Sequence, residues 1–180
     1  MSVLSDSAIL QSIQSGDIVI DPFNPDHINP NSVDLTLHDT VKQYDPDIRE
    51  LDVKKHNPVL EYKIPGGGLL LHPGELYLMS TNERAGTRKY HSQLKGKSSL
   101  ARLGLFIDCT ASWGDTGFIN HWTLEVSVVK PLRIYPNMKI CQIIFSTVHG
   151  EVLNPYDKKP DSKYNGDNRA KESMYHLNFK

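Results

Sequence analysis

The sequence is poor in cysteine and has no long apolar run, and both shortages exclude classes of protein. Only Cys109 and Cys141 occur among its 180 residues, and their spacing matches no metal-binding motif. No apolar run approaches the roughly 20 residues that a membrane-spanning helix needs. The start, MSVLSDSAIL, lacks the basic region and the long apolar stretch of a signal peptide. We therefore expect a cytoplasmic protein with no membrane partner.

A surplus of charge of one sign is also missing. Lys and Arg together number 20 and Asp and Glu 21, which leaves a formal net charge of -1 at pH 7. Proteins that bind nucleic acid or anionic membranes through their overall charge carry an excess of Lys and Arg. We expect no nucleic-acid partner, and any phosphate group must be bound by a local cluster of cations.

Length and patterning predict one β domain. Ser5 is suited to cap a short helix that ends at Gly16. After it, apolar residues recur at every second position, as in SVDLTL, which indicates half-buried strands. Strands are predicted at residues 18–20, 33–37, 68–71, 75–80, 105–109, 122–129, 132–135 and 139–148. Many short strands separated by Pro-rich and Gly-rich turns are typical of an all-β sandwich or barrel.

The last predicted strand and the tail differ in character. KICQIIFSTV (139–148) is apolar on both faces, so it should be central, with Gln142 facing a pocket or an interface. Residues 154–180 have few aliphatic side chains and carry much of the late charge. Such a segment becomes ordered only against another surface. We therefore divide the chain into a β domain, residues 1–153, and a C-terminal arm, residues 154–180.

The segment GKSSLARLGL (96–105) is suited to bind a polyphosphate. Ser98 can cap a short helical turn whose free N–H groups point outward, and Lys97 and Arg102 add positive charge there. The glycine spacing differs from GxxxxGK[ST], which excludes a P-loop. The alternative interpretation is a solvated helix start with two surface cations.

The segment TASWGDTGF (110–118) is a turn of small residues with one carboxylate and two aromatic rings. Asp115 can accept a hydrogen bond from a sugar hydroxyl, and Phe118 can stack on a ring or exclude a 2′-hydroxyl. The glycines allow the backbone to approach a ligand closely. The alternative is an Asp-Gly turn that only joins two strands.

A carboxylate interrupts the strand pattern of WTLEVSV (122–128). Trp122, Leu124 and Val126 share one face, while Glu125 lies on the other with Thr123. Such a carboxylate either faces solvent or is held in a cleft. In a cleft, burial raises a carboxyl pKa toward neutrality, which suits general acid and base chemistry.

Zinc chemistry is not expected. Zinc-dependent nucleobase deaminases carry an H-x-E element followed by P-C-x-x-C, and neither element occurs here. The eight histidines show no pairing at the spacing of helical zinc ligands. We interpret each of them as a surface or core residue.

Taken in order, GKSSLARLGL, TASWGDTGF, TLE and the KY of the tail resemble the dCTP deaminase family of the trimeric dUTPase-like superfamily. Upstream, INPNSVDLTL and LHPGELYLMSTNE resemble two further strands of that family, so the similarity covers nearly the whole chain. The resemblance implies a distorted β-barrel or jelly-roll with a short N-terminal helix. It also implies a homotrimer with shared active sites, Mg²⁺ bound through the nucleotide triphosphate, and dTTP as a candidate inhibitor.

The reaction implied by the resemblance is the hydrolysis of dCTP to dUTP and ammonia without zinc. In it, Glu125 takes a proton from water and passes it to the cytosine ring. Ser98 and the Ala111 carbonyl orient this water, and Arg102 lies beside the catalytic glutamate. Water attacks C4, a tetrahedral intermediate forms, and ammonia leaves after protonation.

The phosphate and sugar contacts are implied in the same way. Lys97, Ser98 and Ser99 match the triphosphate cradle of the family. Gln142 matches a strand glutamine near the phosphates, and Asp115 matches the ligand of the deoxyribose 3′-hydroxyl.

The resemblance also assigns base and tail contacts. Thr123 and Leu124 match the strand that reads the base through its backbone. Tyr156 and Lys163 match tail residues that close over the nucleotide, and Asp167 stands where a phosphate-binding glutamine is usual.

The chain departs from the family pattern at four positions. Lys97 stands where arginine is usual. The two parallel hydrogen bonds that a guanidinium makes to a phosphate are therefore replaced by the point charge of an ammonium group. Gly114 replaces a bulky aliphatic residue, and Lys95 replaces a common glutamate. Asp167 adds an anion near the phosphates unless Mg²⁺ or Arg169 offsets it. A modified or shorter nucleotide is therefore an alternative substrate.

Three other functions remain as alternatives. A dUTPase shares the fold, but its strand lacks a base equivalent to Glu125, which therefore favours deamination. A second alternative is a bifunctional enzyme that forms dUMP and diphosphate. Trp113 directly before Gly114 and Asp115 resembles the sequence of such enzymes at this turn. A nucleotide sensor without catalytic activity is the third, and the presence of both Ser98 and Glu125 disfavours it.

Overall fold

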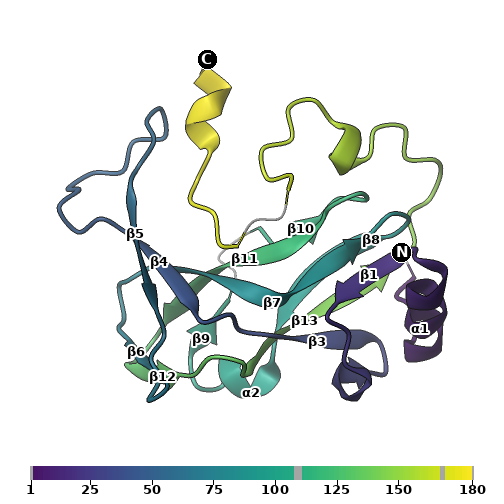
Figure 1. Ribbon diagram of the computed structural model, residues 1–180, viewed down its shortest axis with the longest axis horizontal. Helices are drawn as coiled ribbons and strands as arrows, with labels where there is room; N and C mark the ends of the chain where they lie inside the picture. Colours follow the sequence, from purple (N-terminus) through teal and green to yellow (C-terminus); the bar gives the residue numbers. More distant parts are fainter. Residues whose placement is uncertain (1, 108–110, 167–168, 180) are drawn as a thin grey trace.

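A computed structural model describes residues 2–107, 111–166 and 169–179 of the chain (Figure 1). Asp167 therefore lies outside the described residues, as does the end of the strand predicted at 105–109. No helix in the described ranges is long and apolar enough to cross a membrane.

The helix near the N-terminus is the one that the sequence predicts. Helix α1 (Asp6–Ser15) begins after Ser5, whose hydroxyl accepts a hydrogen bond from the Ala8 N–H at 3.4 Å. It ends at Gly16, which has the left-handed φ of 78° that glycine adopts without strain. Ile9 is fully buried and anchors the helix to the core.

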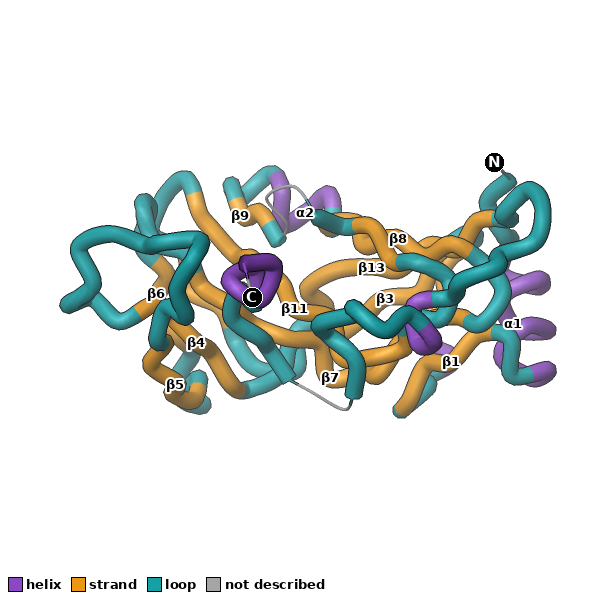
Figure 2. The backbone as a smooth tube through the Cα atoms, turned by 90° about the horizontal axis from the view of Figure 1, so that it is seen from above, coloured by secondary structure: helices purple, strands orange, loops and turns teal. Residues whose placement is uncertain are grey.

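Two antiparallel sheets and a two-stranded ribbon make up the rest of the domain (Figure 2). The strand bounds are β1 Ile18–Asp21, β2 Ile28–Asn29, β3 Ser32–Thr36, β4 Thr40–Tyr44, β5 Val59–Lys63, β6 Leu69–Leu71, β7 Tyr77–Thr87, β8 His91–Gly96, β9 Leu105–Phe106, β10 Trp113–Gly114, β11 Ile119–Val128, β12 Leu132–Ile134 and β13 Lys139–Ser146. Short helical turns are η1 Pro25–His27, α2 Ser98–Ala101, η2 Tyr156–Lys158 and η3 Tyr175–Phe179.

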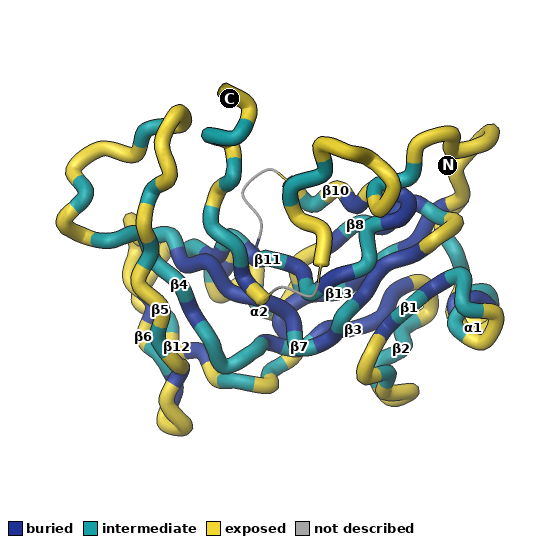
Figure 3. The backbone as a smooth tube through the Cα atoms, turned by 45° about the horizontal axis from the view of Figure 1, so that its top comes forward, coloured by how far each residue is buried: buried dark blue, intermediate teal, exposed yellow. Residues whose placement is uncertain are grey.

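The first sheet has the order β5-β4-β7-β11-β9, with β1 also paired to β7. The second has the order β10-β8-β13-β3-β2. The position of β13 between β8 and β3 confirms that KICQIIFSTV forms a central strand. Ile140, Ile143 and Phe145 of this strand are inaccessible to solvent, whereas Gln142 and Ile144 are half-buried (Figure 3).

The mainly β class is confirmed, but the predicted barrel does not close within the described residues. The first sheet ends at β5 and β9, and the second ends at β10 and β2. A closed barrel requires its two edge strands to pair with each other, and these edge strands do not. The predicted mainly β fold is therefore confirmed, and its two sheets stay open in the described residues instead of closing into a barrel.

The apolar periodicity of the sequence did not predict several of the strands. The strands β4, β5 and β8 contain few aliphatic residues, and β8 buries the polar residues His91 and Ser92. Their pairing with better-marked neighbours places them in sheets, which a local apolar pattern does not encode.

Candidate active site

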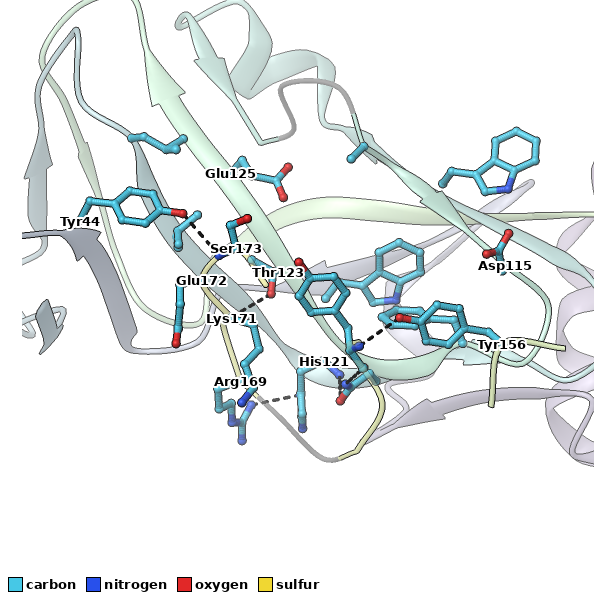
Figure 4. Close-up of a pocket in the computed structure, with 18 residues that line it drawn as sticks. Tyr44, Asp115, His121, Thr123, Glu125, Tyr156, Arg169, Lys171, Glu172 and Ser173 are labelled. Carbon is cyan, nitrogen blue, oxygen red and sulfur yellow. Dashed lines mark hydrogen bonds between the residues drawn. The ribbon is translucent and has the colours of Figure 1, made fainter. Parts of the chain in front are cut away.

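A cavity of about 430 Å³ lies above β11, between the strand and the C-terminal tail (Figure 4). The residues that line it come from five parts of the chain and are Tyr44, Leu76, Leu78, Ala111, Trp113, Asp115, Phe118, Asn120, His121, Trp122, Thr123, Glu125, Tyr156, Tyr164, Arg169, Lys171, Glu172 and Ser173. Six of the residues predicted from the sequence are therefore together in one site: Ala111, Asp115, Phe118, Thr123, Tyr156 and Glu125.

The alternation of β11 directs Glu125 into this cavity. Along Ile119–Val128 buried and half-buried residues alternate strictly, with Leu124 and Val126 fully buried. Thr123 and Glu125 are on the opposite face, as the sequence predicts. Leu124 contributes its side chain to the core, so only its backbone remains to contact a ligand.

The Asp115 turn is held against the start of the tail. The Phe118 N–H donates to the Asp115 carbonyl at 3.0 Å, which closes the turn. Gly117 has a φ of 95°, and a Cβ there would lie 2.9 Å from the Tyr156 backbone nitrogen. The Phe118 ring packs edge-on against Tyr156, with centroids 5.3 Å apart. The turn thus brings Asp115, Phe118 and Tyr156 to the same wall of the cavity.

The tail contributes Lys171 and Ser173, which the sequence analysis did not select, and Arg169, which it named only as a counter-charge to Asp167. The Lys171 N–H donates to the Thr123 hydroxyl at 3.1 Å, and the Ser173 N–H donates to the Tyr44 hydroxyl at 3.4 Å. One Arg169 guanidinium nitrogen donates to the Thr81 carbonyl at 3.3 Å. Seen from above, the C-terminal segment lies over β11 (Figure 2). No local pattern marked these residues, because their partners are far away in the sequence.

An ion pair fixes the tail to the strand β4. The Lys42 ammonium lies 3.1 Å from the Glu172 carboxylate, and the His56 ring lies 3.5 Å from it on the other side. Burial of Glu172 opposes ionisation, but hydrogen bonds from its own backbone, Lys42 and His56 outweigh burial and lower the pKa of this carboxyl. Glu172 is therefore negatively charged at neutral pH and attracts Lys42.

The predicted phosphate cradle lies outside this cavity. Lys97, Ser98, Ser99 and Arg102 do not line the cavity, and α2 lies at the lower edge of Figure 1 while the tail lies at the upper edge. Ser98 does not cap the helix, because α2 begins at Ser98 and Lys97 occupies the N-cap position without a side-chain bond. In this conformation Lys97 extends to Asp34 in β3 instead.

Gln142 and Lys163, two further residues predicted to contact the nucleotide, bond to other parts of the chain. The Gln142 amide donates to the Gly96 carbonyl at 3.2 Å and accepts from the Ser32 hydroxyl at 2.7 Å. Lys163 bonds to the Asn178 side chain within the tail. Neither residue lines the cavity that contains Glu125.

Comparison with known proteins decides the family. The family model described as "dCTP deaminase-like" matches residues 3–148. A protein of Clostridium beijerinckii named "dCTP deaminase, dUMP-forming" is 46% identical over 177 residues, which cover 98% of each chain. The chain belongs to the dCTP deaminase-like family.

Other relatives agree with this assignment. A protein of Leptospira biflexa with the same name is 41% identical over 98% of each chain. The crystal structure of 2′-deoxycytidine 5′-triphosphate deaminase from Agrobacterium tumefaciens superposes with a TM-score of 0.63 at 20% identity. It covers 84% of this chain and half of the Agrobacterium chain, and it supports the fold alone. The expected class, a hydrolase that acts on a carbon–nitrogen bond, is confirmed by the family.

Metal ligands are not grouped in the described part of the chain. Within residues 2–107, 111–166 and 169–179, no three His, Cys, Asp or Glu side chains are arranged to hold a metal ion. Cys141 is fully buried, and burial keeps its thiol protonated by raising its pKa far above the ordinary range.

Proposed function

We propose that the protein deaminates dCTP and hydrolyses the product to dUMP and diphosphate. The observation that carries this proposal is the presence of two separate carboxylates, Glu125 and Asp115, in one cavity (Figure 4). Relatives that are 41% to 46% identical over 98% of the chain are named dUMP-forming deaminases. The formation of dUMP is favoured over the release of dUTP that the resemblance first implied.

Glu125 is the proposed base of the deamination. Its carboxylate takes a proton from water, and the resulting hydroxide attacks C4 of cytosine. The same proton is passed to the ring, and ammonia leaves from the tetrahedral intermediate after a second proton transfer. The carbonyl of Ala111 accepts a hydrogen bond from the water, while Thr123 and the Leu124 backbone hold the base against β11.

Asp115 and its neighbours are proposed to hold the sugar. The Asp115 carboxylate accepts the 3′-hydroxyl, and the Phe118 ring leaves no room for a 2′-hydroxyl. Asp115 is also the carboxylate that would orient water for attack on the α-phosphate in the second step. That step consumes one further water and divides dUTP into dUMP and diphosphate.

A second copy of the chain is proposed to complete each site. The cradle residues Ser98, Ser99 and Arg102 are exposed and lie outside the cavity. Beside them, Leu103 and Phe106 are large apolar side chains exposed on the same corner of the molecule. A contact through this corner would bury apolar surface and bring the cradle of one subunit to the cavity of another. A homotrimer with shared sites fits this arrangement.

Residues 154–180 are proposed to act as an arm that closes over the nucleotide. Tyr156, Lys163 and Asp167 are the tail contacts expected from the resemblance, and Arg169 and Lys171 add two cations close to the cavity. Closure would exclude water that is not needed for the reaction. By the same reasoning dTTP, which shares the sugar and phosphates, is a candidate inhibitor of this site.

Mg²⁺ is proposed to arrive with the triphosphate. Hard cations are commonly bound through substrate phosphates and a few carboxylates. The carboxylate nearest to Lys97 is that of Asp34, and two lysines already engage it. Phosphate oxygens are thus the main ligands in this proposal, and the charge that Mg²⁺ supplies would offset the anionic phosphates.

The variant Glu125→Gln tests the proposal because it retains the size of the side chain but cannot accept the proton. Ammonia release from dCTP should fall by at least the roughly 10²- to 10⁴-fold typical of general acid–base catalysis. Diphosphate release from dUTP should persist, because Asp115 remains. Both products are measured with Mg²⁺ for the wild type and the variant.

The matched control is Glu50→Gln, the same substitution at an exposed position in the loop between β4 and β5. It should leave both rates at the wild-type level. Ammonia release by Glu125→Gln near the wild-type rate would remove Glu125 from the mechanism. Wild-type protein that forms dUTP from dCTP but no dUMP would restrict the function to deamination.

A further inference from the structure

A second polar cluster lies outside the cavity, where a buried carboxylate joins two lysines. The side chain of Asp34 in β3 is only 6% exposed. One of its oxygens accepts from the Lys97 ammonium at 2.5 Å and from the Asn29 amide at 3.1 Å. The other oxygen lies 3.3 Å from the ammonium of Lys139 in β13.

This cluster is continuous with the expected phosphate contacts. Asp34 is directly opposite Gln142 in the ladder between β3 and β13. Gln142 bonds in turn to Gly96, the residue before Lys97. The three strands β8, β13 and β3 are adjacent in one sheet. Backbone pairing therefore holds Asp34, Gln142 and Lys139, and Lys97 follows directly after the end of β8.

The charges favour a bound anion. Two lysines and one aspartate carry a combined charge of +1, and all three groups belong to one hydrogen-bonded unit. Burial opposes ionisation of Asp34, but the hydrogen bonds from Lys97 and Asn29 outweigh it and lower the pKa of this carboxyl. The carboxylate is therefore ionised at neutral pH and holds both ammonium groups.

An ammonium group has three donors, and a carboxylate occupies only one of them. Lys139 uses a second donor on the Asp26 carbonyl at 3.4 Å, and both lysines still have an N–H group left while they are held on the two oxygens of Asp34. Without the carboxylate the two like charges would repel each other. Lys139, whose side chain is 41% exposed on a flexible stem, would then keep its hydrogen bond to the Asp26 carbonyl but lose the ionic contact that holds it beside Lys97.

We propose that Asp34 is a positioning residue of the phosphate site and that Lys139 is a second cation of that site. Lys97 alone is a point charge and cannot form the two parallel bonds that a guanidinium forms. Two ammonium groups on one carboxylate supply the two-point contact that the usual arginine would make by itself. The ligand class is a linear polyphosphate. That this polyphosphate belongs to a nucleotide rests on the proposed function.

The test uses inorganic tripolyphosphate as a probe that needs no turnover. Its dissociation constant is measured by calorimetry with full-length wild type, Asp34→Asn and Lys139→Gln. Lys139→Gln loses one charge-assisted contact to the polyphosphate, and Asp34→Asn loses the carboxylate that positions both lysines. Tripolyphosphate binding should therefore weaken roughly fivefold to tenfold in each variant. With dCTP as substrate, KM should rise by a similar factor and by more than kcat falls.

The matched control is Asp17→Asn. The Asp17 carboxylate also pairs with a lysine, Lys89, at 3.0 Å, but it lies beside β1 and away from the cluster. Tripolyphosphate binding by this variant should equal that of the wild type. A general effect of losing one carboxylate would appear in both aspartate variants, whereas the positioning role predicts a change in Asp34→Asn alone.

Binding by Asp34→Asn as tight as in the wild type, or tighter, would overturn the proposal, since the carboxylate would then only neutralise the lysines. If Asp34→Asn does not fold, Lys139→Gln decides alone, because it leaves the buried carboxylate paired with Lys97. Unchanged binding by Lys139→Gln overturns the proposal as well. Wild-type protein that binds tripolyphosphate but releases no ammonia from dCTP would refute the proposed function and leave this inference standing.

Discussion

The ion pair between Lys42 and Glu172 should determine how firmly the tail covers the cavity. The substitution Glu172→Gln removes the charge and keeps the shape. The paired side chains are 17% and 21% exposed, so the interaction should exceed that of a fully exposed pair. We expect a cost of about 1 kcal/mol, which is roughly a fivefold shift from closed toward open tail.

Hydrogen exchange measures this shift directly. The amides of Lys171 and Ser173 are protected by bonds to Thr123 and Tyr44 in the closed tail. Their exchange should become roughly fivefold faster in Glu172→Gln. Exchange in the body of the β domain should not change, because the substitution removes no core contact.

The control is Glu61→Gln, since Glu61 lies 3.8 Å from the same lysine but is 58% exposed and belongs to β5 rather than to the tail. It should leave the exchange of Lys171 and Ser173 unchanged. Equal exchange in wild type and Glu172→Gln would refute the idea that this pair holds the tail. Equal acceleration in both variants would attribute the effect to Lys42 rather than to the tail contact.

The pH dependence has a definite sign. The pKa of Glu172 is lowered in the folded chain from the ordinary value of 4.5, so its contribution is fully present above that value. It is lost as the pH falls through the lowered pKa, when the carboxyl is protonated and Lys42 loses its partner. Intrinsic amide exchange itself slows in acid, so the quantity to compare is the protection factor, the intrinsic rate divided by the observed rate. Below about pH 4.5 the protection factors of the tail amides should fall in the wild type but less in Glu172→Gln.

Three further predictions concern the assembly, the metal and the arm. Light scattering should give about three chain masses. If each site spans two subunits, an equal mixture of Glu125→Gln and Arg102→Ala subunits should regain activity in about a quarter of the sites. No regain of activity after subunit exchange would place both residues in one subunit. Turnover should require Mg²⁺ and resist zinc chelators, and loss of activity that only zinc restores would contradict this. Deletion of residues 154–180 should leave the domain folded by circular dichroism but weaken nucleotide binding, and full activity of the truncated chain would exclude a role for the arm.

Much of the cavity wall could be predicted from the sequence because local rules decide it. The alternation in WTLEVSV places Glu125 opposite Leu124, since successive side chains of a strand point to opposite faces. Ser5 and Gly16 bound α1 because capping depends on a few neighbouring residues. The motifs around Glu125 and Asp115 identified the family, which the comparisons confirm.

The tertiary structure alone decided which of these segments meet. Glu172 contacts Lys42 across 130 positions of sequence, and Lys97 contacts Asp34 across 63. Neither pairing leaves a local pattern, because it depends on strand order and on the path of the tail. For the same reason the open sheets, and the separation of the cradle from Glu125, could not be predicted from motif order. A strand pattern determines which face a side chain occupies, whereas the packing of distant strands determines which side chains share a site.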